Sequence, residues 1–130
     1  MNLRNSMSRP RPKYLNLLQI RLPIPGLVSI LHRVSGAVLF LFIPFLLVLL
    51  ELTLESPASF LRFKAVLTHW AVKLLVIGLV WAYLHHLLAG IRHLALDLDY
   101  GTELPAARAS SQAVLVTGIV LAVIFGVMLW

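Results

Sequence analysis

Long stretches without a charged residue dominate the pattern of hydrophobic and polar positions along this chain. Residues 34–50, 74–91 and 112–130 contain no Asp, Glu, Lys or Arg. A helix needs about 20 mainly apolar residues to cross a hydrocarbon core about 30 Å thick, and each stretch approaches that length. The pattern therefore predicts an all-α membrane protein with three transmembrane helices.

Prolines and polar residues set the expected boundaries of these helices. Residues 1–25 contain Pro10, Pro12, Pro23 and Pro25, and each proline disfavours helix at the residue before it. Ser56 and Pro57 together are typical of a helix N-terminus. We expect an N-terminal arm over 1–25 and one transmembrane domain over 26–130, with helices near 26–52, 60–98 and 111–130, a bend at Pro44, and a loop at 103–111 containing Pro105.

The composition supports a membrane location. Hydrophobic residues make up 60% of the chain, against roughly 45–50% in globular proteins. The net charge of +6 could suggest nucleic acid, but five of the eleven basic residues precede residue 22. That distribution fits the positive-inside rule and not a nucleic-acid-binding face. We expect a bacterial inner-membrane protein with a cytoplasmic N-terminus and a periplasmic C-terminus.

The chain contains no cysteine. This excludes disulfides, a thiolate-held iron–sulfur cluster and a covalently attached c-type haem within the chain. A Gly-rich dinucleotide fingerprint is also absent from the sequence. Any haem must therefore be bound non-covalently.

Polar residues inside the predicted helices are the candidates for function, because such groups are costly in a membrane. The first helix begins with Ser29, His32 and Arg33, which lie on one helical face. Since the second helix runs back, its polar cluster should lie at a similar depth. That cluster consists of His85, His86, Arg92, His93 and Asp97.

His86 is the deepest polar group on its face of the second helix. It lies eleven residues before Asp97, or about 16 Å at 1.5 Å per residue. A buried imidazole there needs a metal or a hydrogen-bond partner, and Gly90 leaves room for a flat group near the backbone. His85 is an equal candidate ligand on these grounds. Interhelical hydrogen bonding, helix-end polarity and snorkelling toward the interface are the simpler explanations for these histidines and for Arg92.

The segments Ser29-Ile-Leu-His-Arg-Val-Ser-Gly36 and His86-Leu-Leu-Ala-Gly-Ile-Arg-His93, followed by Asp97, resemble the two signatures of the cytochrome b anchor subunit of succinate dehydrogenase. The resemblance implies that His86 is one axial ligand of a single haem b. It places Ser29 and Arg33 at the ubiquinone site. It also implies that His32 and Arg33 approach the haem propionates, and we expect His32 or Asp97 to help carry protons.

The resemblance also implies a set of partners in respiratory complex II, which links the tricarboxylic acid cycle to electron transport. A second membrane anchor subunit would supply the other haem ligand and complete a helical bundle in the lipid bilayer. Succinate would be oxidised on a flavoprotein subunit, and an iron–sulfur subunit would carry the electrons here. Three alternatives remain open: a quinol:fumarate reductase anchor, an intramembrane proton or ion relay without haem, and a purely structural anchor.

Overall fold

The computed structural model describes residues 22–130, which form four helices and, within that range, no strand. The helices are α1 (Ile24–Glu55), α2 (Pro57–Leu67), α3 (Trp70–Asp97) and α4 (Leu104–Leu129). Three of them, α1, α3 and α4, are long and apolar enough to cross a membrane. The prediction of an all-α protein with three spanning helices is confirmed. Most of the expected N-terminal arm lies outside the described residues.

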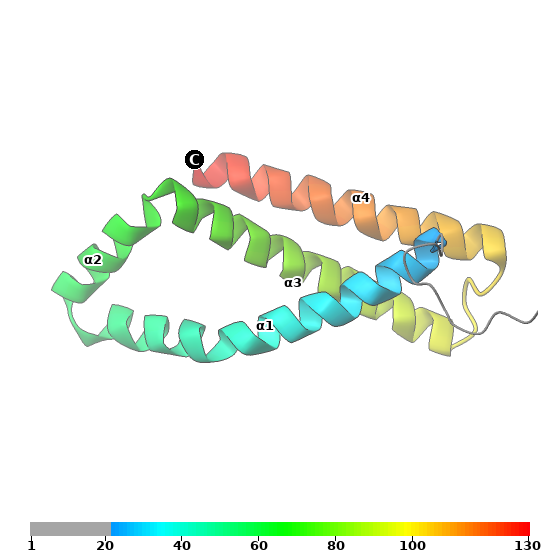
Figure 1. Cartoon of the computed structure of the whole chain (residues 1–130), viewed down its shortest axis with the longest axis horizontal. Coiled ribbons are helices and arrows are strands. Elements are labelled where there is room, and N and C mark those ends of the chain that lie inside the picture. The colour runs from blue at the N-terminus through cyan, green and yellow to red at the C-terminus, as the bar shows by residue number, and fades with distance from the viewer. Residues whose placement is uncertain (1–21) are drawn as a thin grey trace, which may run out of the picture.

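α1 begins at Ile24, slightly before the expected start, with Pro25 in its first turn. Proline is tolerated there because the first backbone N–H groups have no partner within the helix. The helix contains Pro44 and runs to Glu55 without interruption. It is visibly curved (Figure 1), as expected where a proline removes a backbone hydrogen bond.

The second apolar stretch does not form the single helix expected over 60–98. It forms α2 and α3, which are separated at Thr68 and His69, and each of the two helices has its own N-terminal cap. The Ser56 hydroxyl accepts a hydrogen bond from the Ser59 backbone N–H (3.1 Å) at the start of α2. The His69 Nδ1 atom accepts one from the Ala71 N–H (3.2 Å) at the start of α3. The His69 cap stabilises the break between α2 and α3, which hydrophobicity alone does not reveal.

The third spanning helix starts earlier than expected. The expected loop at 103–111 is wrong, because α4 begins at Leu104 and Pro105 occupies its first turn. The turn between α3 and α4 is therefore short. It is closed by two residues in the left-handed region, Asp99 (φ 62°) and Gly101 (φ 73°).

α3 is the central helix and packs against both α1 and α4 (Figure 1). The three spanning helices share a buried cluster that consists of Val28, Ala89 and Val114, one residue from each helix. Small buried residues on α3 and α4, including Ala82, Ser111 and Gly118, allow the two backbones to approach. Toward α2, by contrast, α1 and α3 diverge. The site described below lies where they cross.

Candidate functional site

Three histidines meet where α1 crosses α3. The His32 ring stacks on the His86 ring with centroids 4.2 Å apart and planes 8° apart. The His93 ring lies on the other helix with its centroid 5.1 Å from that of His32. The polar clusters of the two helices thus converge, as their predicted depths implied.

Two glycines make this close approach possible. A Cβ atom on Gly36 would lie 2.7 Å from His86 Cε1, a distance that side chains do not tolerate. A Cβ atom on Gly90 would lie 3.4 Å from His32 Nε2. The sequence predicts that Gly90 leaves room for a flat group, and in the structure the His32 imidazole lies there. Each glycine on one helix accommodates a histidine from the other.

Hydrogen bonds fix the orientation of the His86 ring. Its Nδ1 atom lies 2.9 Å from the His32 carbonyl oxygen, which also accepts a hydrogen bond from the Ser35 hydroxyl (2.9 Å). The Ser35 oxygen lies 3.4 Å from the same Nδ1. Because a carbonyl oxygen can only accept, Nδ1 must carry the proton. In a neutral imidazole this leaves the Nε2 lone pair free to bind a metal.

His85 faces a different environment, although it adjoins His86 in sequence. It is fully buried within the three-helix interior. Its ring stacks on Trp81 with centroids 5.3 Å apart, and its backbone lies opposite Gly118 of α4. Neither ring nitrogen has a hydrogen-bond partner among the described residues.

Arg92 does not extend to the interface but is buried against α4. Its Nε donates to the Ser110 hydroxyl (3.0 Å), and its Nη2 donates to the Ala107 carbonyl (3.3 Å). The Ser110 hydroxyl in turn donates to the same carbonyl (3.2 Å). Arg92 therefore joins α3 to the first turns of α4.

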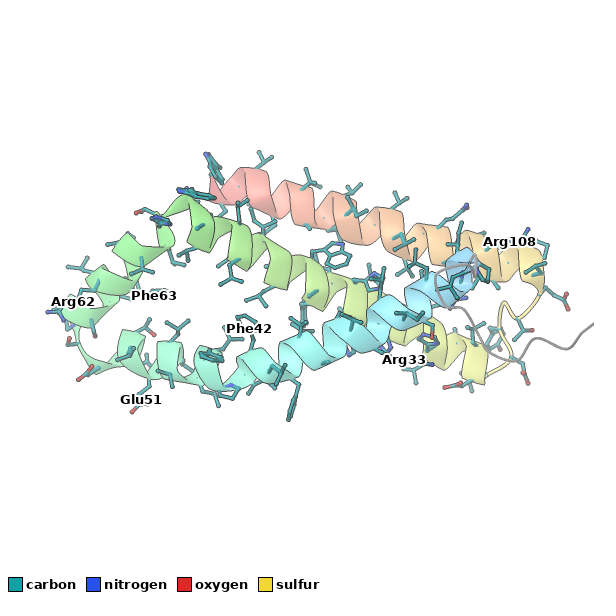
Figure 2. All side chains as sticks on the ribbon, viewed as in Figure 1. Arg33, Phe42, Glu51, Arg62, Phe63 and Arg108 are labelled. Atoms are coloured by element: carbon teal, nitrogen blue, oxygen red, sulfur yellow. The ribbon has the colours of Figure 1, made fainter. Side chains whose placement is uncertain are left out.

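The remaining predicted site residues lie around the histidines. Ser29 is half-buried and Arg33, one turn further along α1, is exposed. Figure 2 places Arg33 in the half of the molecule away from α2. Asp97 is the exposed last residue of α3. Within residues 22–130 no three His, Asp or Glu side chains are arranged to hold a metal ion.

Two contacts of the site were not expected from the sequence. Ser35 bonds the His32 carbonyl of its own helix and is also buried beside His86. Helix-end polarity was a sufficient explanation for His93 in the sequence, but its ring packs near the His32 ring. Their spacing carried a signal in each case, since Ser35 lies three residues after His32 and His93 lies seven after His86.

Comparison with known proteins identifies the family. Residues 7–125 match the family model described as succinate dehydrogenase/fumarate reductase transmembrane subunit. The chain is 40% identical over 126 residues to a succinate dehydrogenase cytochrome b556 subunit of Coxiella burnetii, covering 95% of this chain and 100% of that protein. It is 37% identical over 114 residues to the cytochrome b556 subunit of Paracoccus denitrificans, covering 88% of both chains. A Rickettsia felis cytochrome b556 subunit is 31% identical over 117 residues, covering 90% of this chain and 91% of that protein.

These matches extend over nearly all of the chain, including the three spanning helices and the segments that carry the histidines. The resemblance to the anchor subunits of succinate dehydrogenase is thereby confirmed. This chain is a multi-pass membrane protein that belongs to the transmembrane anchor subunits of the succinate dehydrogenase and fumarate reductase complexes.

Proposed function

We propose that this chain is the haem b-binding anchor of a succinate:ubiquinone oxidoreductase and forms part of its ubiquinone site. One observation carries the haem assignment. The bond from His86 Nδ1 to the His32 carbonyl (2.9 Å) leaves Nε2 as the metal-binding atom. Histidines that bind metals generally donate their other ring N–H to a carbonyl or carboxylate in this way.

His86 fits a haem better than His85 does. The His86 ring is half-buried at the crossing of α1 and α3, so a group shared with a neighbouring subunit can reach it. The His85 ring is enclosed by this chain's own helices, and iron supplied from outside them cannot approach it without moving α4. We therefore assign His86 as the residue of this chain that would hold the haem iron.

The residues of this chain have separate tasks in the proposed site. Haem b, when bound, supplies a one-electron redox centre. The His32 carbonyl and the Ser35 hydroxyl hold the His86 ring in one tautomer. Gly36 keeps α1 close enough to α3 for that bond to form. A further haem ligand would come from the proposed second anchor subunit.

The ubiquinone site is assigned to the α1 face that carries Ser29 and Arg33. The Ser29 hydroxyl donates a hydrogen bond to one quinone carbonyl oxygen. The Arg33 guanidinium stabilises the negative charge that develops as electrons arrive from the iron–sulfur subunit. Two electrons and two protons convert the quinone to quinol, and the protons enter through His32 or Asp97. Succinate itself is oxidised on the flavoprotein subunit.

The proposed setting is the bacterial inner membrane with a cytoplasmic N-terminus. The start of α1 and the α3–α4 turn lie at the same end of the molecule, whereas the C-terminus lies at the α2 end (Figure 1). An odd number of spans requires this separation of the two chain ends. The excess of basic residues before position 22 favours the cytoplasm for the first end.

The visible spectrum of the purified complex tests the haem assignment. His86→Leu should abolish the reduced-minus-oxidised b-type signal, whereas His85→Leu should retain it. His86→Gln distinguishes ligand loss from misfolding, because its amide N–H can still donate to the His32 carbonyl while its side chain offers no imidazole. Loss of the signal in His85→Leu alone would show that the ligand is His85.

The same measurement separates the competing functions. A wild-type complex without a haem spectrum would favour the histidines as a proton relay. A haem-containing complex that runs faster as a quinol:fumarate reductase would favour that reverse reaction. The subunit composition of the purified complex tests the proposed partners.

A further inference from the structure

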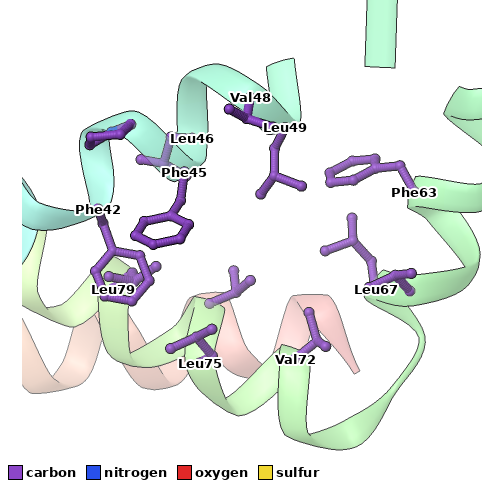
Figure 3. A pocket seen from close by; sticks show the side chains of 13 residues that line it. Phe42, Phe45, Leu46, Val48, Leu49, Phe63, Leu67, Val72, Leu75 and Leu79 are labelled. Carbon is purple, nitrogen blue, oxygen red and sulfur yellow. The ribbon is translucent and has the colours of Figure 1, made fainter. Parts of the chain in front are cut away.

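An apolar cavity of about 580 Å³ lies between α1, α2 and α3, at the end of the molecule away from the histidines. Figure 3 shows side chains from all three helices facing it, among them Phe45 of α1, Phe63 of α2 and Leu75 of α3. The side chains of its thirteen lining residues are all apolar. The proposed haem and quinone sites do not use any of them.

A second, smaller cavity of about 310 Å³ adjoins the first between the end of α1 and α2. Three residues line both cavities: Leu49, Phe63 and Val66. The smaller cavity differs in carrying polar groups, namely Glu55, Ser59 and Arg62. Figure 2 shows Arg62 at the outer side of α2, with Phe63 turned toward the bundle. The two cavities together form an apolar chamber with a charged rim.

We propose that these joined cavities bind one phospholipid with an ethanolamine headgroup. An acyl chain occupies the apolar chamber, the phosphate lies at Arg62, and the ammonium group lies at Glu55. A guanidinium is well suited to phosphate because it donates parallel hydrogen bonds. A headgroup with one negative and one positive charge matches the opposite charges of Arg62 and Glu55, which form no ion pair with each other in the described structure.

The shape of the chamber favours a lipid over a helix of a partner subunit. α2 joins the ends of α1 and α3 and closes the chamber at that end (Figure 1). A helix that crosses the bilayer would have to continue past this point. An acyl chain can end inside the chamber, because its headgroup stays at the rim and its methyl end needs no exit.

The proposal also explains the position of the charges. Arg62 and Glu55 line the smaller cavity and not the larger apolar one, so a headgroup can meet a cation and an anion there while its acyl chain stays among apolar side chains. A neutral quinone head would gain nothing comparable from this pair. Charge complementarity therefore distinguishes the occupant from a second quinone.

Native mass spectrometry of the whole complex after extensive detergent washing tests the proposal. The wild-type complex should retain one phosphatidylethanolamine at this site. Arg62→Gln should weaken retention about tenfold, because a charge-assisted bond to phosphate is lost. Lys64→Gln is the matched control, since Lys64 lies on the same helix and lines neither cavity. Equal retention in the two variants would overturn the proposal.

The apolar chamber and the headgroup preference have separate controls. Val72→Phe adds bulk inside the chamber and should displace the lipid, whereas Leu74→Phe adds the same group on the exposed face of α3. Glu55→Gln should reduce the preference for phosphatidylethanolamine over phosphatidylglycerol. Unchanged binding in Val72→Phe, or an unchanged preference in Glu55→Gln, would contradict the proposed pose.

Cross-linking identifies the occupant directly. The chain contains no cysteine, so Leu75→Cys gives this chain a single attachment point for a photoreactive group within the chamber, and the wild-type complex treated in the same way is the control for labelling of other subunits. A lipid adduct in the assembled complex supports the proposal. An adduct with another subunit or with a quinone would show a different occupant and overturn it. An unchanged haem spectrum in each variant would establish that the complex is intact.

Discussion

The two ends of this bundle differ in how closely α1 and α3 pack. At the histidine end, α1 and α3 approach so closely that Gly36 meets the edge of the His86 ring. At the α2 end the same two helices diverge around a cavity of about 580 Å³. One pair of helices thus forms both a tight polar contact and an open apolar chamber.

Residue size explains the difference. The close end has glycines and Ser35 at the contact, which let backbones approach and leave short polar groups to bond across. The open end has bulky rings, including Phe42, Phe45 and Phe63, which hold the helices apart. We expect functions that need fixed distances between side chains, such as holding a metal ligand in place, at the close end. Apolar contacts at the open end depend less on exact distances.

The largest effect should follow from closing the space at Gly36. A Cβ atom there would lie 2.7 Å from His86 Cε1, so Gly36→Ala must displace the ring or separate the helices. We expect most of the haem to be lost and the complex to be destabilised by about 1–3 kcal/mol. Haem content per complex, from the visible spectrum, is the measurement.

Two other glycines, which are less crowded than Gly36, serve as controls. Gly90→Ala should have a smaller effect, since its Cβ would lie 3.4 Å from His32 Nε2. Gly78→Ala should retain full haem content, because a Cβ at Gly78 meets nothing within 4 Å. If all three variants lost haem equally, close approach of α1 and α3 would not be the cause.

The sequence predicted the spanning helices well and their ends less well. Uncharged length identified all three spans, because burial in lipid depends on hydrophobicity. It missed the break at Thr68 and His69, which depends on a side-chain cap within an otherwise continuous pattern. It also misplaced the start of α4. A loop was expected around Pro105, but proline is also common in the first turn of a helix, and it lies there in α4.

For the site, spacing predicted which helical faces carry polar groups but not which groups touch. It did bring the polar clusters of the two helices to a similar depth, and the structure stacks the His32 and His86 rings. It left His85 and His86 as equal candidates, because adjacent residues differ in direction by about 100° and only the packing of α4 decides which is enclosed. The bond from Arg92 to α4 joins residues far apart in sequence, so spacing along one helix carries no signal for it.

A charge comparison between the two ends should give the next largest effect. Arg33→Leu removes a cation facing the developing quinone charge, so succinate–quinone activity should fall by about 10²-fold. Lys64→Leu removes an exposed cation of α2 that lines neither cavity and should leave that activity unchanged. Both variants should retain succinate oxidation by a soluble artificial acceptor. A similar loss in the two variants would show that the effect is general to the membrane domain.

A smaller effect is expected at Ser29. Ser29→Ala removes one neutral hydrogen bond of about 0.5–1.5 kcal/mol, which corresponds to a two- to tenfold loss of quinone turnover. The ratio of quinone to artificial-acceptor activity measures it at matched haem content. Thr53→Ala is a suitable control, because its hydroxyl bonds only the Leu50 carbonyl of its own helix near the other end. An unchanged ratio for Ser29→Ala would place the quinone elsewhere.

The smallest effect should come from the C-terminal residue at the α2 end. The Lys73 ammonium group lies 4.8 Å from the centre of the Trp130 ring, which joins the end of α4 to the start of α3. Since Trp130 is largely exposed, this cation–π contact should contribute only about 0.5–1 kcal/mol. Trp130→Leu should therefore lower the thermal stability of the complex slightly, with haem content and quinone turnover unchanged. Lys73→Met should have a similar effect, and the double variant should lose less than the sum, because the two residues stabilise through one contact. Additive losses would mean that the two residues do not stabilise through a shared contact. A loss of haem in Trp130→Leu would mean that the α2 end of the bundle is coupled to the histidine end, contrary to the separation of the two ends.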